Sequence, residues 1–271
     1  MYLVTGATGT VGRPLVELLR GSGVRAVSRS VTELPGAEVV TEPEFTGVDG
    51  VFLNARAVGL DAADLLARAG EQGVRRVVVL AASNVDEPLD EQPSRFNGDR
   101  NAEVEAAAID SGLEWVSLRP TYFAVNAEYS WGGQLRRGDV VRAPFPEATE
   151  APIDPRDIAA VAAAALTTDD LVGDKLLLTG PESLTHTEMV ATIGRVLGRD
   201  LRLEPVPVEI ASRVLVDNGH RPEFVTALMD RYRREAGRPA HVSADAEKAL
   251  GRPPRPFAEW VADHAALFTR A

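Results

Sequence analysis

The chain opens with a short apolar run and then changes to a helical spacing of its apolar residues. Residues 2–4 are apolar at every position, which predicts a buried strand. From residue 11 the apolar side chains recur as on one face of a helix: Val11, Leu15, Leu18 and Leu19. Pro14 falls in the first turn, where a missing N–H is tolerated, and the glycines of residues 21–23 predict the helix end.

This alternation of apolar runs and helical spacing continues to about residue 120. It predicts further strands at residues 24–28, 39–40, 51–53, 74–80 and 115–118. Helices are predicted at residues 61–69, with Asp61 as the N-cap, and at residues 102–109. Residues 85–96 are rich in proline and acidic residues and predict a surface loop. Strands and helices that alternate in this way predict an α/β fold, a doubly wound parallel sheet with helices on both faces.

Beyond residue 120 the pattern loses its period and then becomes mainly helical. Residues 121–131 are aromatic, which suits either a segment that faces a substrate or a buried corner, and residues 138–146 predict an extended loop. Asp154 predicts the cap of one helix, and Thr185 with Glu188 predicts a capping box for another. The remaining predicted elements are strands at 175–179 and 201–206 and helices at 209–216, 222–236 and 257–268. We therefore expect a core of residues 1–120, completed by about 151–180, and a smaller, mostly helical part in residues 121–271.

Three glycines, Gly6, Gly9 and Gly12, connect the first strand to the first helix. Gly6 allows a tight turn, Gly9 lets a pyrophosphate approach the backbone, and Gly12 lets the helix pack closely on the strand. The free N–H groups at the start of the helix attract the phosphates. The sequence therefore predicts a dinucleotide site in this loop, which also contains Thr8, Thr10 and Val11.

The ends of the other predicted strands supply the remaining candidates, because ligands of a doubly wound sheet bind beyond the carboxyl ends of its strands. The candidate cofactor contacts there are Ser28, Arg29, Asn54, Ala55, Arg56, Ala82, Ser83, Thr121 and Phe123. Asn84, Tyr122 and Asn126 are the candidates for contact with a substrate. Arg29 stands where an acidic residue would bind the ribose 2′-hydroxyl of NAD(H), and an arginine suits a 2′-phosphate. We therefore expect NADP(H) in preference to NAD(H), unless Arg29 is only a solvated residue at a strand end.

Composition narrows the classes of partner. The formal net charge of -11 in 271 residues argues against a nucleic-acid partner, and the absence of cysteine excludes disulfides and thiolate chemistry. No histidine is spaced for metal binding with another histidine or a carboxylate cluster, so no metal is expected. The chain begins with a core strand, and its longest apolar stretch, residues 158–166, is too short to span a bilayer. We expect a cytoplasmic protein that acts on a small molecule and does not bind a membrane.

Several motifs together resemble the NmrA-like, atypical branch of the short-chain dehydrogenase/reductase superfamily, whose members are NAD(P)-binding Rossmann proteins. The matching segments cover nearly the whole length: residues 4–12, 111–120 with Asn126, 153–159, 178–182 and 251–254. The resemblance implies NADPH or NADH held at residues 6–12, with Arg29 beside it. It also implies a substrate pocket between the sheet and the C-terminal segments, so that residues 121–271 are mainly the substrate-binding part.

Two departures from the superfamily pattern concern the site. Residues 39–51 are shorter than usual and lack the acidic turn that often lies near the adenine. The better-known enzymes use a serine with a Tyr-x-x-x-Lys pair, in which the lysine lowers the pKa of the acidic tyrosine. Ser83 matches the serine, but the tyrosine and lysine positions fall on Asn97 and Asn101. The usual acid is therefore absent.

Three functions are compatible with these residues. The first is an NADPH-dependent reductase of a small electron-poor acceptor, such as a quinone, an azo or triarylmethane dye, or an enone. In that case Ser83 holds the acceptor oxygen and Tyr122 or solvent gives the proton, although Tyr122 suits packing equally well. The second is a non-catalytic NADP(H) sensor that binds another protein, as regulatory members of this branch do. The third is a tailoring enzyme that uses bound cofactor for isomerisation or cyclisation.

Overall fold

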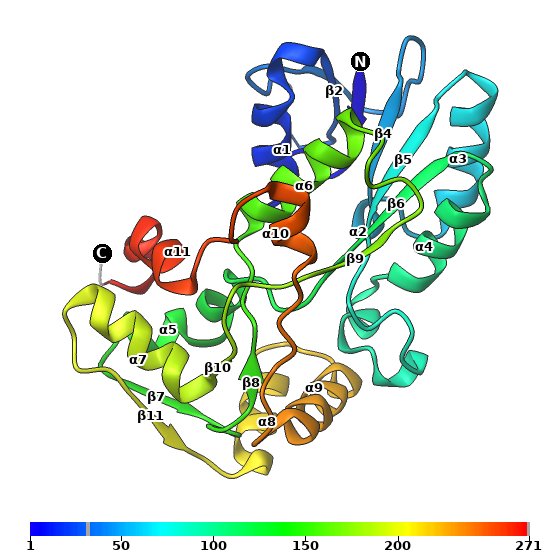
Figure 1. Cartoon of the computed structure of the whole chain (residues 1–271). Helices are drawn as coiled ribbons and strands as arrows, with labels where there is room; N and C mark the ends of the chain where they lie inside the picture. Colours follow the sequence, from blue (N-terminus) through cyan, green and yellow to red (C-terminus); the bar gives the residue numbers. More distant parts are fainter. Residues whose placement is uncertain (31–32, 270–271) are drawn as a thin grey trace.

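Seven short strands lie side by side and parallel, in the order β3-β2-β1-β4-β5-β6-β9 (Figure 1). The structure, a computed structural model, describes residues 1–30 and 33–269. The bounds of these strands are β1 Tyr2–Val4, β2 Val24–Val27, β3 Glu38–Val40, β4 Gly50–Asn54, β5 Arg76–Leu80, β6 Glu114–Pro120 and β9 Lys175–Leu178. Every strand predicted for this sheet is present, and the doubly wound parallel sheet is confirmed. The strand order reverses between β1 and β4, which is where such folds bind ligands.

Helices cover both faces of the sheet. One face carries α1 (Gly12–Leu18), α6 (Pro155–Thr167) and α10 (Asp245–Leu250), and the other carries α2 (Ala55–Val58), α3 (Ala62–Glu71) and α4 (Asn101–Asp110). Side chains of the strands alternate between the two cores, so that Leu3 and Val51 face α3 while Val4 and Phe52 face α1. Because both faces are covered, the central strands β1, β4 and β5 are mainly apolar, as the sequence pattern predicts. In the part of the chain that is described, no helix is long and apolar enough to cross a membrane.

A smaller, mostly helical assembly lies below the carboxyl edge of the sheet (Figure 1). It contains two small two-stranded sheets, in which β7 (Val140–Ala143) pairs parallel with β11 (Arg202–Pro205) and β8 (Thr149–Glu150) pairs antiparallel with β10 (Leu184–Thr185). Its helices are α5 (Gly133–Leu135), α7 (His186–Leu197), α8 (Val208–Asp217), α9 (Pro222–Glu235) and α11 (Phe257–Asp263). A π-helical turn spans Glu128–Gly132, and 3-10 turns span Arg20–Ser22, Gly59–Asp61, Leu89–Glu91, Pro93–Asn97 and Ala265–Phe268. The predicted capping box of Thr185 and Glu188 is confirmed at the start of α7.

Four local predictions are wrong or incomplete. Asp61 makes no capping hydrogen bond, because it lies in a 3-10 turn and not in the extended conformation that a cap requires. Leu18 is exposed, since α1 ends there and Leu19 takes the buried position instead. Residues 85–96 are not only a surface loop, because two 3-10 turns form and Gln92 is buried. The extended loop predicted at residues 138–146 contains strand β7.

A buried carboxylate ties the C-terminal segment to α6. Asp157, which has no exposed surface, accepts hydrogen bonds from the Arg252 guanidinium at 2.6 Å and from the Arg255 backbone N–H at 2.6 Å. The Arg255 guanidinium also contacts this carboxylate. Asp154 caps the same helix by accepting a bond from the Arg156 N–H at 2.8 Å, as predicted. These contacts fix α11 against the end of α6 that points toward the smaller part (Figure 1).

The turn after β1 leaves no room for a side chain at Gly6 or at Gly12. Gly6 has a φ of +64°, in the left-handed region that favours glycine. A Cβ placed on Gly12 would lie 2.2 Å from the Gly6 carbonyl oxygen and 2.8 Å from the Ala7 Cα. The turn therefore requires glycine at both positions for steric reasons alone.

We predict that Gly12→Ala lowers the free energy of unfolding by about 1–3 kcal/mol, because the added methyl group pushes α1 away from the turn. Gly21→Ala is the matched control, since a Cβ on Gly21 meets nothing within 4 Å. The control should change the unfolding free energy by less than about 0.5 kcal/mol. Urea titrations of both variants measure the two effects, and equal midpoints would contradict the steric explanation.

Candidate functional site

The glycine loop is held at the point where the strand order reverses. The Thr5 hydroxyl donates to the Phe52 carbonyl at 3.1 Å and accepts from the Asn54 N–H at 2.8 Å, which ties the end of β1 to the end of β4. Within the loop, the Gly9 N–H donates to the Gly6 carbonyl at 2.9 Å. Gly9 and Thr10 are exposed, and Thr8 is half-buried. The loop thus presents exposed backbone at the start of α1, beside Val11, which makes no side-chain cap.

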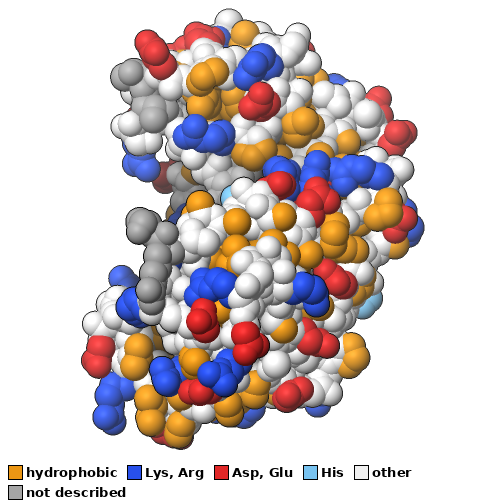
Figure 2. Space-filling model, turned by 90° about the vertical axis from the view of Figure 1, so that its left-hand side faces the viewer, with side chains coloured by type: hydrophobic (Ala, Val, Ile, Leu, Met, Phe, Trp, Pro, Cys, Tyr) orange, Lys and Arg blue, Asp and Glu red, His pale blue; other side chains and the backbone are white. Residues whose placement is uncertain are grey.

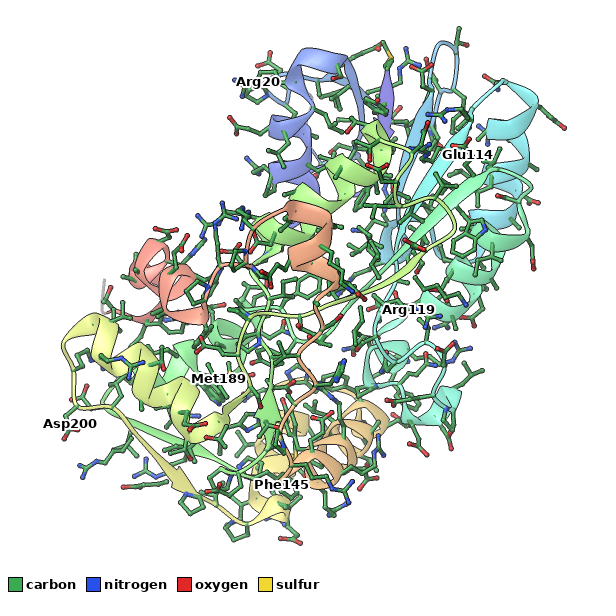
Figure 3. The ribbon with its side chains drawn as sticks, in the orientation of Figure 1. Arg20, Glu114, Arg119, Phe145, Met189 and Asp200 are labelled. Atoms are coloured by element: carbon green, nitrogen blue, oxygen red, sulfur yellow. The ribbon has the colours of Figure 1, made fainter. Side chains whose placement is uncertain are left out.

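The predicted residues after β4, β5 and β6 lie along the same edge. Backbone hydrogen bonds continue beyond the strands, from Ser83 N–H to the Pro120 carbonyl at 3.0 Å and from Thr121 N–H to the Leu178 carbonyl at 3.0 Å. In Figure 3, Glu114 marks the amino end of β6 and Arg119 lies near its carboxyl end, toward the smaller part. The edge that carries the candidate residues therefore faces the smaller part of the molecule.

Three polar side chains on this edge are available to a ligand. Ser83, Asn84 and Asn126 are partly exposed, and their side chains make no hydrogen bond within the described residues. The hydroxyl of Thr121, by contrast, donates to the carbonyls of Ala151 and Leu178 at 3.2 and 3.3 Å. The hydroxyl of Thr121 is thus hydrogen-bonded within the fold, whereas the side chains of Ser83, Asn84 and Asn126 have no such partner among the described residues.

The other predicted cofactor residues differ in exposure. Arg29 is exposed directly after β2 and makes no ion pair within the described residues. Ser28 is buried and accepts a bond from the Ser30 N–H at 3.2 Å. Asn54 caps α2 by accepting from the Arg56 N–H at 3.1 Å, a helix that the sequence pattern did not indicate. Ala55 is buried, Ala82 is half-buried, and Phe123 packs against the core on the α1 and α6 face.

Tyr122 lies inside the smaller part. It is 4% exposed and packs in one core with Trp131, so the buried-corner alternative describes this side chain. Burial raises the pKa of the Tyr122 phenol well above 10, and a hydrogen bond with Ser130 opposes this only in part. This direction is opposite to the lowered pKa that a lysine gives the acid of the better-known enzymes.

The positions of the missing Tyr-x-x-x-Lys pair do not share a helix. Asn97 ends the 3-10 turn Pro93–Asn97, and Asn101 begins α4. Gly98, between these two residues, has a left-handed φ of +97° and ends the 3-10 turn. Asn101 donates to the Ser94 hydroxyl at 3.4 Å, so it is used locally. A hydroxyl-and-ammonium pair with the usual helical spacing is therefore not available here.

Sequence reasoning missed a polar cluster beside Tyr122, in which Glu150, His186 and Tyr232 are buried and Arg231 is half-buried. The Arg231 guanidinium donates to the Glu150 carboxylate at 2.5 Å and to the Glu235 carboxylate at 3.0 Å. His186 packs edge-on against Tyr232, with ring centroids 4.7 Å apart. No apolar period marks Glu150 in the sequence, because β8 consists only of Thr149 and Glu150, so local pattern gave no signal for this cluster.

Burial moves two pKa values in this cluster in opposite directions. Desolvation raises the pKa of Glu150 to about 7, although Arg231 opposes it. Desolvation, with Arg231, lowers the pKa of His186 to about 4. One oxygen of Glu150 and the Nε2 atom of His186 have no hydrogen-bond partner in the structure. Near neutral pH the histidine is therefore uncharged, and Glu150 is partly protonated.

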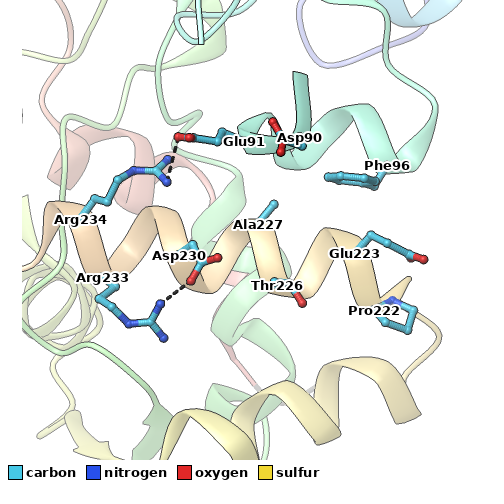
Figure 4. A pocket seen from close by; sticks show the side chains of 10 residues that line it. All are labelled: Asp90, Glu91, Phe96, Pro222, Glu223, Thr226, Ala227, Asp230, Arg233 and Arg234. Atoms are coloured by element: carbon cyan, nitrogen blue, oxygen red, sulfur yellow. Dashed lines mark hydrogen bonds and ion pairs between the residues drawn. The ribbon is translucent and has the colours of Figure 1, made fainter. Parts of the chain in front are cut away.

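Two adjoining grooves lie between residues 89–100 and α9. The larger, about 650 Å³, is lined by Phe96 on one side and by Thr226 and Ala227 on the other (Figure 4). The second, about 530 Å³, shares Asp90 and Phe96 with it. The glycine loop lines neither groove. A separate indentation between the two parts of the molecule is visible from the side (Figure 2). Among the described residues, no group of three or more histidine or acidic side chains is placed to hold a metal ion.

Comparison with known proteins identifies the class to which this fold and loop belong. The family described as NAD(P)H-binding matches residues 6–169. The chain is 38% identical to the (4-alkanoyl-5-oxo-2,5-dihydrofuran-3-yl)methyl phosphate reductase of Streptomyces griseus, over 99% of both chains. It is 30% identical to an NAD(P)H azoreductase of Xenophilus azovorans, over 100% of both. An NADPH-dependent quinone oxidoreductase of Escherichia coli, solved with NADPH, has the same fold, with a TM-score of 0.80 at 21% identity over 98% of this chain and 100% of that one.

The fold and the glycine loop thus define an NAD(P)H-binding oxidoreductase. The chain belongs to the NAD(P)H-binding family. The predicted resemblance to NmrA-like proteins is supported at the level of the fold, since the solved structure of an NmrA variant matches this chain with a TM-score of 0.73 at 17% identity over 99% of this chain and 96% of that one. The chain is an NAD(P)H-dependent reductase. The loop is compatible with the pyrophosphate of such a cofactor, because Gly9 and Thr10 are exposed and a Cβ at Gly9 would meet only the Gly6 carbonyl, which leaves its outer side open.

We predict that Glu150 and His186 contribute to stability with opposite pH dependence. The pKa of Glu150 rises from 4.5 to about 7, so its contribution is full below pH 4.5 and is lost as the pH rises through 7. The pKa of His186 falls from 6.5 to about 4, so its contribution is full above pH 6.5 and is lost as the pH falls through 4. Between pH 7 and pH 5 each change amounts to about 2 kcal/mol, and the two nearly cancel.

Urea unfolding at pH 7 and pH 5 separates the two groups. Relative to the parent protein, Glu150→Gln should lose about 2 kcal/mol of unfolding free energy on acidification, and His186→Phe should gain about as much. Glutamine keeps an acceptor for Arg231, and phenylalanine keeps the ring contact with Tyr232. Parallel pH profiles for all three proteins would show that neither group titrates as described.

Proposed function

We propose that this protein transfers hydride from NADPH to a small electron-poor organic acceptor, such as an enone, a quinone or a dye. The observation that carries the proposal is the set of free polar side chains, Ser83, Asn84 and Asn126, on the carboxyl edge that also holds the glycine loop. The names of the two similar reductases support it, since one acts on an unsaturated furanone phosphate and the other on azo compounds.

The missing acid pair favours acceptors of this kind. Hydride attack on the β-carbon of an enone breaks the carbon–carbon π bond and leaves an enolate, whose charge is spread onto oxygen. Such an anion needs hydrogen bonds more than immediate protonation, so positioning and electrostatic stabilisation suffice. Asn97 and Asn101, where the usual tyrosine and lysine would stand, are consistent with this requirement.

We assign the residues as follows. Ser83 donates its hydroxyl hydrogen bond to the acceptor oxygen and holds the charge that develops there. Asn84 and Asn126 orient the acceptor, and solvent supplies the proton to the enolate. Tyr122 shapes the wall behind them, because its burial and raised pKa make the phenol a poor acid. Bound NADPH supplies the hydride, and residues 6–12 hold its pyrophosphate.

NADPH is preferred over NADH in this proposal because Arg29 is free to bind a 2′-phosphate. Its guanidinium is exposed at the end of β2, with no carboxylate paired to it within the described residues. A guanidinium forms two parallel bonds to a phosphate, which adds both affinity and selectivity.

Ser83→Ala should lower kcat by about 10²-fold with an enone or quinone, because the hydrogen bond to the developing anion is lost. The KM for NADPH should stay within about twofold, since the cofactor loop is untouched. Ser22→Ala is the control, because Ser22 is exposed and precedes β2, at the opposite edge of the sheet from the candidate site. Steady-state assays of NADPH oxidation against a panel of enones, quinones and dyes measure both constants. Tight NADPH binding without turnover on any acceptor would overturn the reductase proposal and favour a sensor.

Arg29→Ala should weaken NADPH binding by about tenfold or more and leave NADH binding unchanged, because only NADPH carries the 2′-phosphate. Titration of each cofactor by the quenching of intrinsic fluorescence gives the two dissociation constants. Arg202→Ala, which removes an exposed arginine from the smaller part, controls for the change in net charge. Equal loss of affinity for both cofactors would argue against phosphate recognition by Arg29.

A further inference from the structure

The smaller of the two grooves is rich in arginine. It holds about 530 Å³, and three of the residues that line it are Arg95, Arg100 and Arg221. Arg95 and Arg100 come from the segment that follows β5, whereas Arg221 immediately precedes α9 in the other part of the molecule. Asp90 is the one acidic residue in the lining, although the whole chain carries a net charge of -11. The groove therefore concentrates positive charge between the two parts.

Two of the three guanidinium groups lack a hydrogen-bonded carboxylate in the described structure. Arg221 is exposed and makes no ion pair, and Arg100 donates to backbone carbonyls of Arg95 and Asp99 at 3.1 and 2.8 Å. The Asp99 carboxylate lies nearby but pairs with Arg56. Arg95 alone has an acidic partner, Glu103, at 2.7 Å. Cations left in this state bind phosphate oxygens well, because a guanidinium matches their geometry.

Most of the groove lining belongs to the segment that connects β5 to α4, and Ser83 and Asn84 stand at the start of this same segment. Asn97, where the resemblance places the usual acid, lines the groove next to Gly98 and Arg100. Asp99, between Gly98 and Arg100 in the chain, forms an ion pair with Arg56, with 3.7 Å between the carboxylate and the guanidinium. Arg56 lies in α2, which directly follows β4. An acceptor that reaches both places must therefore extend from Ser83 along this segment to the arginines.

The amino end of helix α9 adds to the positive electrostatic potential of the groove. Arg221 is its N-cap and makes no side-chain capping bond, so the first amides of a 14-residue helix are left without a capping partner. Glu223 in the first turn opposes this effect, but it lines the neighbouring groove and not this one. Phe96 and Asp90 separate the two grooves, and Figure 4 shows Phe96 lying over the first turns of α9.

We infer that Arg95, Arg100 and Arg221 bind the phosphate group of a phosphorylated acceptor. The inference rests on the proposed reductase function and defines its substrate class as phosphate monoesters of small unsaturated carbonyl compounds. The phosphate takes no part in the chemistry. It anchors one end of the acceptor, so that binding energy from a remote group positions the carbon that receives hydride.

Phenyl phosphate is the probe for this site, added to protein saturated with NADP+. Isothermal titration should give one binding site, whose dissociation constant rises about tenfold or more in Arg221→Ala and in Arg100→Ala. Arg221→Lys should retain part of the affinity, since it keeps the charge but not the planar fork. Arg202→Ala, an exposed arginine elsewhere, should bind as the parent does. Arg221 is the decisive position, because its exposed side chain supports no packing.

Several results would overturn the inference. They are the absence of phenyl phosphate binding, equal affinity in the parent protein and both alanine variants, and binding to the cofactor-free protein, in a parallel titration, that saturating NADP+ abolishes. The last would place the phosphate in the cofactor site. Because this measurement needs no turnover, it is independent of the acceptor panel. A phosphorylated enone compared with its free alcohol completes the test, and the lower KM of the phosphate should disappear in Arg221→Ala.

Discussion

The close approach of α1 to the turn that follows β1 is the constraint on which the proposed cofactor site depends. No side chain fits between Gly12 and the Gly6 carbonyl, so the first residue of α1 lies in close contact with the turn. Thr5 then fixes this turn to β4, where the strand order reverses. The exposed residues of the loop, Gly9 and Thr10, thereby lie at the switch point of the sheet, which is where we propose that the pyrophosphate binds. The chemistry of the site follows from this steric condition.

The rest of the candidate site lies between the sheet and the smaller, mostly helical part, whose residues are far apart in the sequence. Asp157 draws the Arg252 and Arg255 segment onto α6, and α9 lies against residues 89–97. The candidate substrate region therefore lies between an edge with free polar side chains and a helical part with a buried, nearly neutral polar cluster. Arg221 and Arg100 meet in one groove only because these two parts are apposed.

Local patterns predicted most elements because each depends on neighbours in the chain. The apolar runs identified every strand of the main sheet, and the capping residues Asp154 and Thr185 act as expected. Asp61 failed as a cap because the backbone before α3 forms a 3-10 turn, which residue type alone does not reveal. Tyr122 was a candidate ligand contact because it follows the end of a strand. Its side chain instead packs in the core of the smaller part.

The sequence by itself determined the fold class, the cofactor loop and the absence of the usual acid pair, because all three are set by residue type at short spacing. Tertiary structure alone decided which polar side chains are free. Ser83 and Thr121 are both hydroxyl residues after strands, but only Thr121 meets backbone carbonyls, from residues far along the chain. The ion pair of the buried Glu150 with the half-buried Arg231 arises in the same way, and so does the arginine groove. Contacts between distant segments depend on how the two parts pack, and no local pattern encodes that packing.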